Sequence, residues 1–206
     1  MPTPIELFDA EIELSDQELV ARRMEFEKLR AERLRAGDYE GYLLMFDGHK
    51  AFPALLEIED LLPDKDYWKC VADVWYRTDF SFPERGEWLR LFVSQRPHRE
   101  LLMSKTERKR LAAMPGTLTI YRGYEKGRAR SGLAWTLSEK RARIHAESEA
   151  NRARRALFYG IATGGVPMIV CGKCHKRDVL AYFNGRKEQE IVIDGRKVFA
   201  KRDTTL

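Results

Sequence analysis

Residues 117–122 read Thr-Leu-Thr-Ile-Tyr-Arg, and this stretch divides the chain into two kinds of sequence. Its apolar residues alternate in steps of two, and β-branched and aromatic side chains dominate it, which is typical of a β-strand. Just before it, Pro115-Gly116 ends a region in which apolar residues recur at helical spacing. The sequence therefore predicts an α+β protein, with a helical N-terminal domain over residues 1–115 and a mainly β domain over residues 116–206.

Helix signals run through the first part of the chain. Ser15 and Glu18 have the spacing of a capping box, and Gly37 can end the charged helix that follows. Residues 81–84 repeat the capping pattern ahead of an apolar stripe that begins at Trp88. A partner-binding surface would also use aromatic residues, but we expect these to pack in the core.

Strand patterns return throughout the second part. Apolar and β-branched residues cluster in four short runs, separated by turn residues and by one Arg-rich helical stretch. The predicted strands cover residues 133–137, 168–171, 178–183 and 189–193, and the predicted helix covers residues 139–155. Asp194-Gly195 has the composition of a tight turn, so we expect the last strands to form antiparallel hairpins.

Composition excludes several classes of protein. The chain has 206 residues, of which 44% are apolar and 33% charged, as in a globular protein rather than a disordered one. It has no apolar run long enough to span a membrane, and the acidic residues 1–13 do not resemble a signal peptide. Three cysteines cannot build a disulfide scaffold. These features predict a cytoplasmic protein without a membrane partner.

The net charge of +5 is unevenly distributed. The chain has 18 Lys/Arg against 23 Asp/Glu up to Pro115, and 19 against 9 beyond it. A basic second half suits an anionic ligand, and a polynucleotide, a phosphorylated cofactor and an acidic protein all meet that description. A solvated basic surface would explain the same bias without any ligand.

Polar residues stand where the first two strands of this half should be apolar. Arg122 shares the register of core residues, and a buried arginine needs an anionic partner. Gly123 after it leaves room for a ligand to approach the backbone. Thr136 and Ser138 are two residues apart, so their hydroxyls point to one face. A nearby carboxylate would explain Arg122, and capping of the next helix would explain Ser138, without any ligand.

Two carboxylates open the last predicted strand. Glu188 and Glu190 are two residues apart, so we expect them to lie side by side on one face. Like charges at this spacing repel, and strands tend to exclude glutamate. Such a destabilising arrangement is typical of a functional site. An exposed face balanced by Arg186 and Lys187 would explain it without a function.

The order of these motifs is more specific than any one of them. A strand ending in Tyr-Arg-Gly, a strand with Trp-Thr-x-Ser and a late strand opening Glu-x-Glu follow one another between residues 117 and 198. This order resembles the Arg-Ser-Glu class of mono-ADP-ribosyltransferases, which includes cholera-toxin-like, C3-like and phage-encoded enzymes. The resemblance implies a catalytic domain of two facing antiparallel β-sheets with NAD in the cleft. It also implies an acceptor protein as partner, which for a phage-encoded enzyme is a protein in the host cytoplasm.

The resemblance gives each residue of the NAD site a role. Arg122 would be a catalytic residue that holds the phosphate and the nicotinamide-side ribose, and the Gly123 backbone would bind the nicotinamide amide. Trp135, Thr136 and Ser138 would complete the site, at the place of the Ser-Thr-Ser motif that braces NAD and the catalytic glutamate. Leucine occupies the middle of that motif here, so the hydroxyl network is thinner than in the family.

The resemblance also assigns the two carboxylates. Glu190 would be the catalytic carboxylate, and Glu188 the acidic residue that in this family accompanies arginine acceptors. Residues 183–187 would form the turn that recognises the target. Tyr182 and Phe183 are candidate contacts to the acceptor there, although strand aromatics of this kind are equally suited to a buried core.

Other interpretations of the same residues stay open. With water as the acceptor, the same fold would be an NAD glycohydrolase. A non-enzymatic nucleic-acid-binding module would stack bases on Tyr121, Tyr124 and Trp135, although Glu188 and Glu190 would repel phosphates. An interaction protein would instead work through its helical half.

Cys171, Cys174 and His175 have the spacing of a metal or haem site. A structural zinc ion needs four ligands, and the remaining cysteine and histidines are scattered along the chain. We interpret the cluster as a hairpin turn with incidental thiols and expect no metal.

Overall fold

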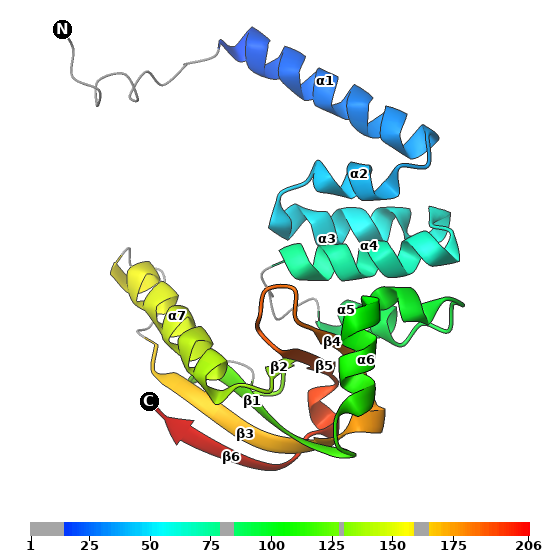
Figure 1. Ribbon diagram of the computed structural model, residues 1–206. Helices are drawn as coiled ribbons and strands as arrows, with labels where there is room; N and C mark the ends of the chain where they lie inside the picture. Colours follow the sequence, from blue (N-terminus) through cyan, green and yellow to red (C-terminus); the bar gives the residue numbers. More distant parts are fainter. Residues whose placement is uncertain (1–14, 79–84, 128–129, 159–164) are drawn as a thin grey trace, which may run out of the picture.

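The computed structural model describes residues 15–78, 85–127, 130–158 and 165–206. Helices come first and antiparallel strands follow, which confirms the α+β class (Figure 1). Helix α6 (Lys105–Ala113) ends just before Pro115, and strand β1 (Thr117–Glu125) begins just after Gly116. The change from helix to strand therefore falls where the sequence predicts it.

The first half contains five further helices among the described residues. The Ser15 hydroxyl accepts a hydrogen bond from the Glu18 N–H and the Glu18 carboxylate accepts one from the Ser15 N–H, which confirms the predicted capping box. Gly37, at φ +72°, follows the end of this helix as predicted. The capping pattern at residues 81–84 lies outside the described residues. The helices are α1 (Asp16–Arg35), α2 (Tyr39–Leu44), α3 (Gly48–Ile58), α4 (Asp64–Arg77) and α5 (Arg85–Phe92), with the short 3-10 turns η1 (Glu59–Leu61) and η3 (Arg99–Leu102).

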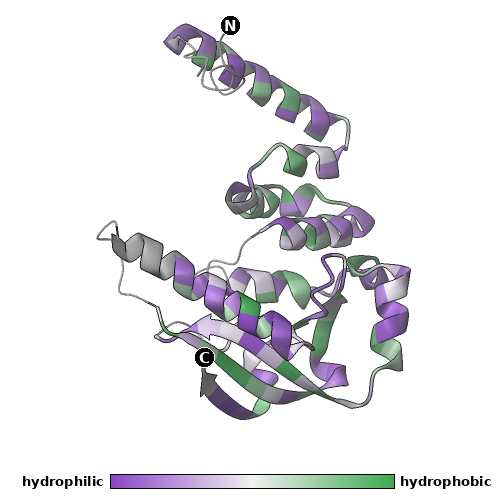
Figure 2. Ribbon diagram, turned by 60° about the vertical axis from the view of Figure 1, so that its left-hand side comes forward, coloured by the Kyte–Doolittle hydropathy of each residue, from purple (hydrophilic) through white to green (hydrophobic). Residues whose placement is uncertain are grey.

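Helix α1 projects away from the rest of the molecule (Figure 1). None of its residues is buried, and hydrophilic residues cover most of its surface (Figure 2). Its last turns contact α2 and the residues just after it, where the Arg30 guanidinium lies 4.1 Å from the centre of the Phe46 ring. No helix in the described ranges combines the length and apolar character needed to cross a bilayer.

One hydrophobic core joins the helices to strands of the second half of the chain. Trp75 stands edge-on to Trp88, with ring centres 4.9 Å apart, and both side chains are fully buried. Their cluster also contains Phe183 and Val192, from the last half of the sheet. The aromatic residues of the helices therefore pack as predicted, and the two predicted domains share a core.

The strands form one antiparallel sheet in the order β4-β5-β2-β1-β3-β6. The resemblance implied two facing sheets, whereas the described strands form one continuous hydrogen-bonded sheet, because β2 pairs with β1 on one side and with β5 on the other. The β1–β2 junction is narrow, with one register pair between Tyr121 and Thr136. After β1, the strands are β2 (Ala134–Thr136), β3 (Pro167–His175), β4 (Val179–Phe183), β5 (Glu190–Ile193) and β6 (Phe199–Thr205).

Two of the predicted hairpin turns are wrong. Asp194 and Gly195 follow β5, but the chain then crosses to the far edge of the sheet, where β6 pairs with β3. Cys171 and Cys174 lie within β3 rather than in a turn. The next strand, β4, does not pair with β3, because it forms an edge of the sheet beside β5. Among the described strands, β4 and β5 are consecutive and pair antiparallel, and so do β1 and β2. Local turn composition does not determine which strands become neighbours.

Two parts of the chain cover the same face of the sheet. Helix α7 (Glu139–Phe158) packs on β1 and β3, where Ala142 and Ala146 contact Ile169. The helical half covers β4 and β5 through the shared core. Thr136 lies on this face between the two, because it stands opposite Tyr121 on β1 and opposite the first residue of β5.

Gly123 is the residue that lets α7 approach β1. A Cβ atom at this position would overlap the Ala142 carbonyl oxygen and lie 2.6 Å from the Ala146 backbone nitrogen. Gly123 faces the helix, so its lack of a side chain is explained by packing alone.

We predict that Gly123→Ala lowers the free energy of unfolding by about 1–3 kcal/mol, because the added methyl group must push the α7 backbone away from the sheet. Gly116→Ala is the matched control, since a Cβ there has no heavy atom within 4 Å. Urea denaturation of the two variants measures the difference. Equal stabilities would show that α7 does not pack as described.

Candidate functional site

The sheet register brings two of the predicted site residues into direct opposition. Thr136 on β2 pairs with Glu190 on β5, so both side chains lie on the face between α7 and the helical half. Thr136 also pairs with Tyr121, whose neighbour is Arg122. Residues far apart in sequence thus meet on three adjacent strands, β1, β2 and β5.

The Thr136 hydroxyl links the two motifs. It donates a hydrogen bond of 2.6 Å to the Glu188 carbonyl oxygen and accepts one of 3.0 Å from the Ser138 N–H. The Ser138 hydroxyl accepts a hydrogen bond from the Arg141 N–H at 3.3 Å. Ser138 therefore caps α7, as the simpler interpretation predicted, while Thr136 fixes the backbone next to Glu190.

Glu190 is enclosed. Its exposed fraction is 7%, and burial raises its pKa to about 7. The Arg186 charge and a hydrogen bond from the Trp75 side chain lower this pKa, whereas the Glu188 charge raises it. Burial therefore favours the protonated form of this carboxyl group more than in an ordinary glutamate.

Glu188 is the more accessible carboxylate. Its side chain is 22% exposed and forms an ion pair of 3.1 Å with Arg186. It precedes β5 instead of lying in it, because the strand begins at Glu190. The non-glycine residues on either side, Lys187 and Gln189, have φ values of 58° and 50°. Two residues in the left-handed region are unusual, and such conformations cluster at functional sites.

Arg122 leaves β1 on the opposite face from Tyr121, and its guanidinium reaches the end of β2. There Nη1 donates a hydrogen bond of 2.7 Å to the Ala134 carbonyl oxygen. Burial lowers the pKa of Arg122 to about 10, although the charges of Glu149 and Glu190 act in the opposite direction and raise it. The buried Nε atom has no hydrogen-bond partner among the described residues. This guanidinium can still receive an anion.

Two predicted cofactor contacts serve the packing of the sheet instead. Trp135 follows the alternation of β2, so it lies on the opposite face from Thr136, in a core cluster with Ile191. Its indole N–H donates to the Gly132 carbonyl oxygen at 3.0 Å. Gly123 lies beneath α7. The structure therefore places Trp135 on the other face from Glu190, whereas Gly123 shares the face of Glu190 but is covered by α7.

Other candidate contacts are also accounted for by packing or pairing. Tyr182 and Phe183 are almost completely buried, which confirms the core interpretation. Arg143, which lies on the helix after Ser138 and belongs to the basic half of the chain, pairs with Glu139 one turn away. In the described parts of the chain no three His, Cys, Asp or Glu side chains are grouped as a metal site would require.

No local sequence pattern indicated which residues of the helices reach the site. Trp75 contacts Glu190, Arg85 adds positive charge near Arg122, and Tyr76 and Glu107 bind the turn between β4 and β5. Trp75 was visible as an apolar position of a helix, and nothing in the local pattern marked it as a contact to a carboxylate.

No protein-family profile, curated protein or solved structure matches this chain.

We predict that stability depends on the protonation of Glu190. Its pKa is about 7 in the folded protein against an ordinary value of 4.5, so between these pH values the folded state holds a proton that the unfolded state releases. Stability should fall by roughly 3 kcal/mol as pH rises from about 4.5 to above 7. Glu190→Gln, which cannot ionise, should lack this loss. Urea unfolding of both proteins across this range measures it, and parallel curves would contradict the enclosed position of Glu190.

Proposed function

We propose that this protein is a mono-ADP-ribosyltransferase, which moves ADP-ribose from NAD to a protein side chain, with arginine as the acceptor. The observation that carries the proposal is the cross-strand pair of Thr136 and Glu190, with the Thr136 hydroxyl bound to the backbone of Glu188. This pair joins the second and third motifs of the resemblance at one point of the sheet. Arg122, from the first motif, supplies the nearby positive charge.

The reaction needs a carboxylate at a protected position. When the bond between nicotinamide and ribose C1′ breaks, its electron pair leaves with nicotinamide, and positive charge develops on the ribose as in glycoside cleavage. An ionised Glu190 close to the ribose 2′-hydroxyl would stabilise that charge, more strongly in an enclosed site than in water. Its burial supports this role.

The two glutamates suit different steps of the reaction. Glu190 would act in the cleavage of NAD, and Glu188 in the attack by the acceptor. The acceptor guanidinium is a poor nucleophile until a base orients it and takes its proton. Glu188 is exposed enough to meet an incoming side chain, and its ion pair with Arg186 already holds a guanidinium. An acceptor arginine would replace that contact, attack C1′ through its nitrogen and release a proton to Glu188.

NAD would be held by a cationic group and a hydroxyl group that both lie near Glu190. The free Nε atom of Arg122 suits a phosphate oxygen, and Thr136 would brace the catalytic carboxylate. Because Glu190 is enclosed, the ribose would reach it only after Trp75 moves from the carboxylate.

NAD hydrolysis is the second candidate, and Glu190 would serve it in the same way with water as the acceptor. The nucleic-acid-binding alternative loses Trp135 as a stacking residue but keeps Tyr121 and Tyr124, which are half-buried. Trp135 is 2% exposed, and the Tyr124 hydroxyl donates to Asp203. Bases cannot stack on a side chain that lies within the core.

The test of this function is labelling with biotinylated NAD in a bacterial lysate, followed by mass spectrometry of the adducts. We expect wild-type protein to label arginine side chains and Glu190→Gln to lose both labelling and nicotinamide release, by about 100-fold or more. Glu188→Gln should lose transfer to arginine to a greater extent than it loses NAD cleavage, because it acts on the acceptor.

Other outcomes separate the alternatives. Free ADP-ribose without labelled protein would favour the glycohydrolase. Absence of NAD turnover together with absence of NAD binding by calorimetry would refute the proposal.

A further inference from the structure

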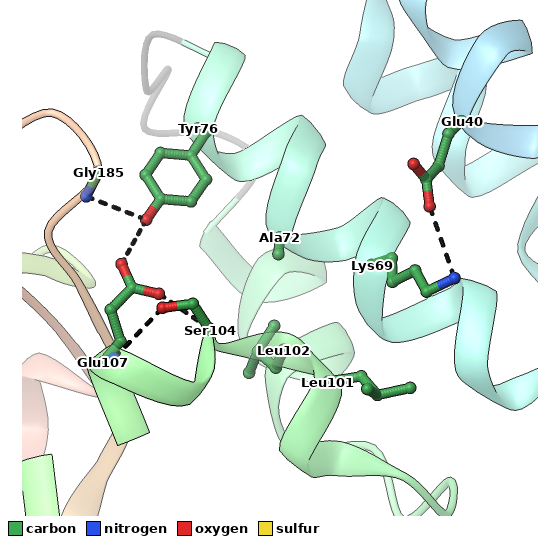
Figure 3. Close-up of a pocket in the computed structure, with 9 residues that line it drawn as sticks. All are labelled: Glu40, Lys69, Ala72, Tyr76, Leu101, Leu102, Ser104, Glu107 and Gly185. Atoms are coloured by element: carbon green, nitrogen blue, oxygen red, sulfur yellow. Dashed lines mark hydrogen bonds and ion pairs between the residues drawn. The ribbon is translucent and has the colours of Figure 1, made fainter. Parts of the chain in front are cut away.

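The turn between β4 and β5 is held by the helical half. This turn spans residues 184–189 and leads directly into Glu190. Two side chains from separate helices bind it, Tyr76 at the end of α4 and Glu107 in the first turn of α6. Both lie beside a pocket of about 580 Å³ that is open to solvent (Figure 3). Its other lining residues are Glu40, Lys69, Ala72, Leu101, Leu102, Ser104 and Gly185.

Glu107 lies at the centre of this arrangement. Its Oε1 accepts a hydrogen bond of 2.8 Å from the Tyr76 hydroxyl (Figure 3). The same oxygen accepts one of 2.7 Å from the Asn184 N–H. Its Oε2 accepts from the Ser104 N–H at 2.9 Å, which closes the capping box of α6. Although burial by itself would raise it, the pKa of Glu107 is lowered, because these hydrogen bonds stabilise the carboxylate.

Tyr76 contacts the turn in three ways. Its hydroxyl accepts a hydrogen bond of 3.4 Å from the Gly185 N–H, and its carbonyl oxygen accepts one of 2.8 Å from Arg186. Its ring packs on Phe183, with ring centres 4.9 Å apart. Burial and the neighbouring Glu107 raise the pKa of the phenol, so it stays protonated and keeps donating to Glu107.

From these contacts a continuous set of interactions runs to Glu188. Arg186, bound to the Tyr76 carbonyl oxygen, forms the ion pair with Glu188. The Asn184 side chain accepts from the Gln189 N–H at 3.1 Å. These bonds close the turn around two residues with positive φ, a conformation that costs free energy unless its surroundings hold it.

We propose that Tyr76 and Glu107 are positioning residues, through which the helical half fixes the β4–β5 turn and so aligns Glu188 with the acceptor side chain. The inference rests on the proposed transferase function. It gives the helical half a defined task, since both positioning residues belong to it. Neither residue touches NAD or the reacting atoms; both act through the turn.

Tyr76→Phe and Glu107→Gln test the inference in the full chain. Tyr76→Phe keeps the ring against Phe183 and removes the hydroxyl. Tyr124→Phe is its matched control, because that hydroxyl bonds Asp203 at the other end of the sheet. Glu59→Gln is the control for Glu107→Gln, since Glu59 pairs with Arg90 on the surface.

The activity measured is transfer to agmatine, a small guanidine, alongside nicotinamide release without an acceptor. We expect kcat/KM for agmatine to fall about tenfold in both variants, because a buried hydrogen bond to a charged group is lost. Nicotinamide release and the KM for NAD should change less than about twofold. Equal losses of transfer and nicotinamide release, or variants that match their controls, would overturn the inference.

Amide hydrogen exchange gives a readout that does not depend on activity. Exchange at residues 184–189 should become about tenfold faster in Tyr76→Phe, while exchange in α4 and β1 stays unchanged. Unchanged exchange in the turn would refute the positioning role. Failure of wild-type protein to release nicotinamide would instead refute the proposed function, and the exchange experiment would still decide whether these residues hold the turn.

Discussion

The antiparallel pairing of β2 with both of its neighbours is the constraint on which the rest of the structure depends. Three residues of β2 connect the β4-β5 half of the sheet to the β1-β3-β6 half. Thr136 pairs across both junctions, and its hydroxyl also fixes the backbone before Glu190. The same short strand therefore closes the sheet and assembles the candidate site. The helical half covers this part of the sheet, because its aromatic core continues onto β4 and β5.

Local patterns predicted much of the fold. The alternation of residues 117–122, the cap at Ser15 and the stop at Gly37 each depend on interactions within a few residues, and each was found as predicted. The order of the strands was beyond such patterns. Asp194-Gly195 has the composition of a hairpin turn, yet β5 and β6 do not pair. β5 is instead buried between β4 and β2, and this tertiary packing overrides the local turn signal.

The site could be predicted only in part, for a similar reason. Thr136 and Glu190 stood out because polar residues in core strands need a partner, and the register makes them partners. The strand alternation that selected Thr136 also places Trp135 on the other face, so that correction was available from the sequence. Tyr76 and Glu107 were not predictable, because their contacts with the turn join residues 77 to 110 positions apart along the chain.

The order in which the strands are synthesised differs from the order in which they pair. β2 is made early in this half of the chain, but its second neighbour, β5, begins 54 residues later, at Glu190 (Figure 1). Until that strand emerges, the helical core lacks Val192 and the edge of β2 has no partner. Such long-range pairing forms late in folding. A growing chain on the ribosome therefore carries no assembled site until β5 has been synthesised.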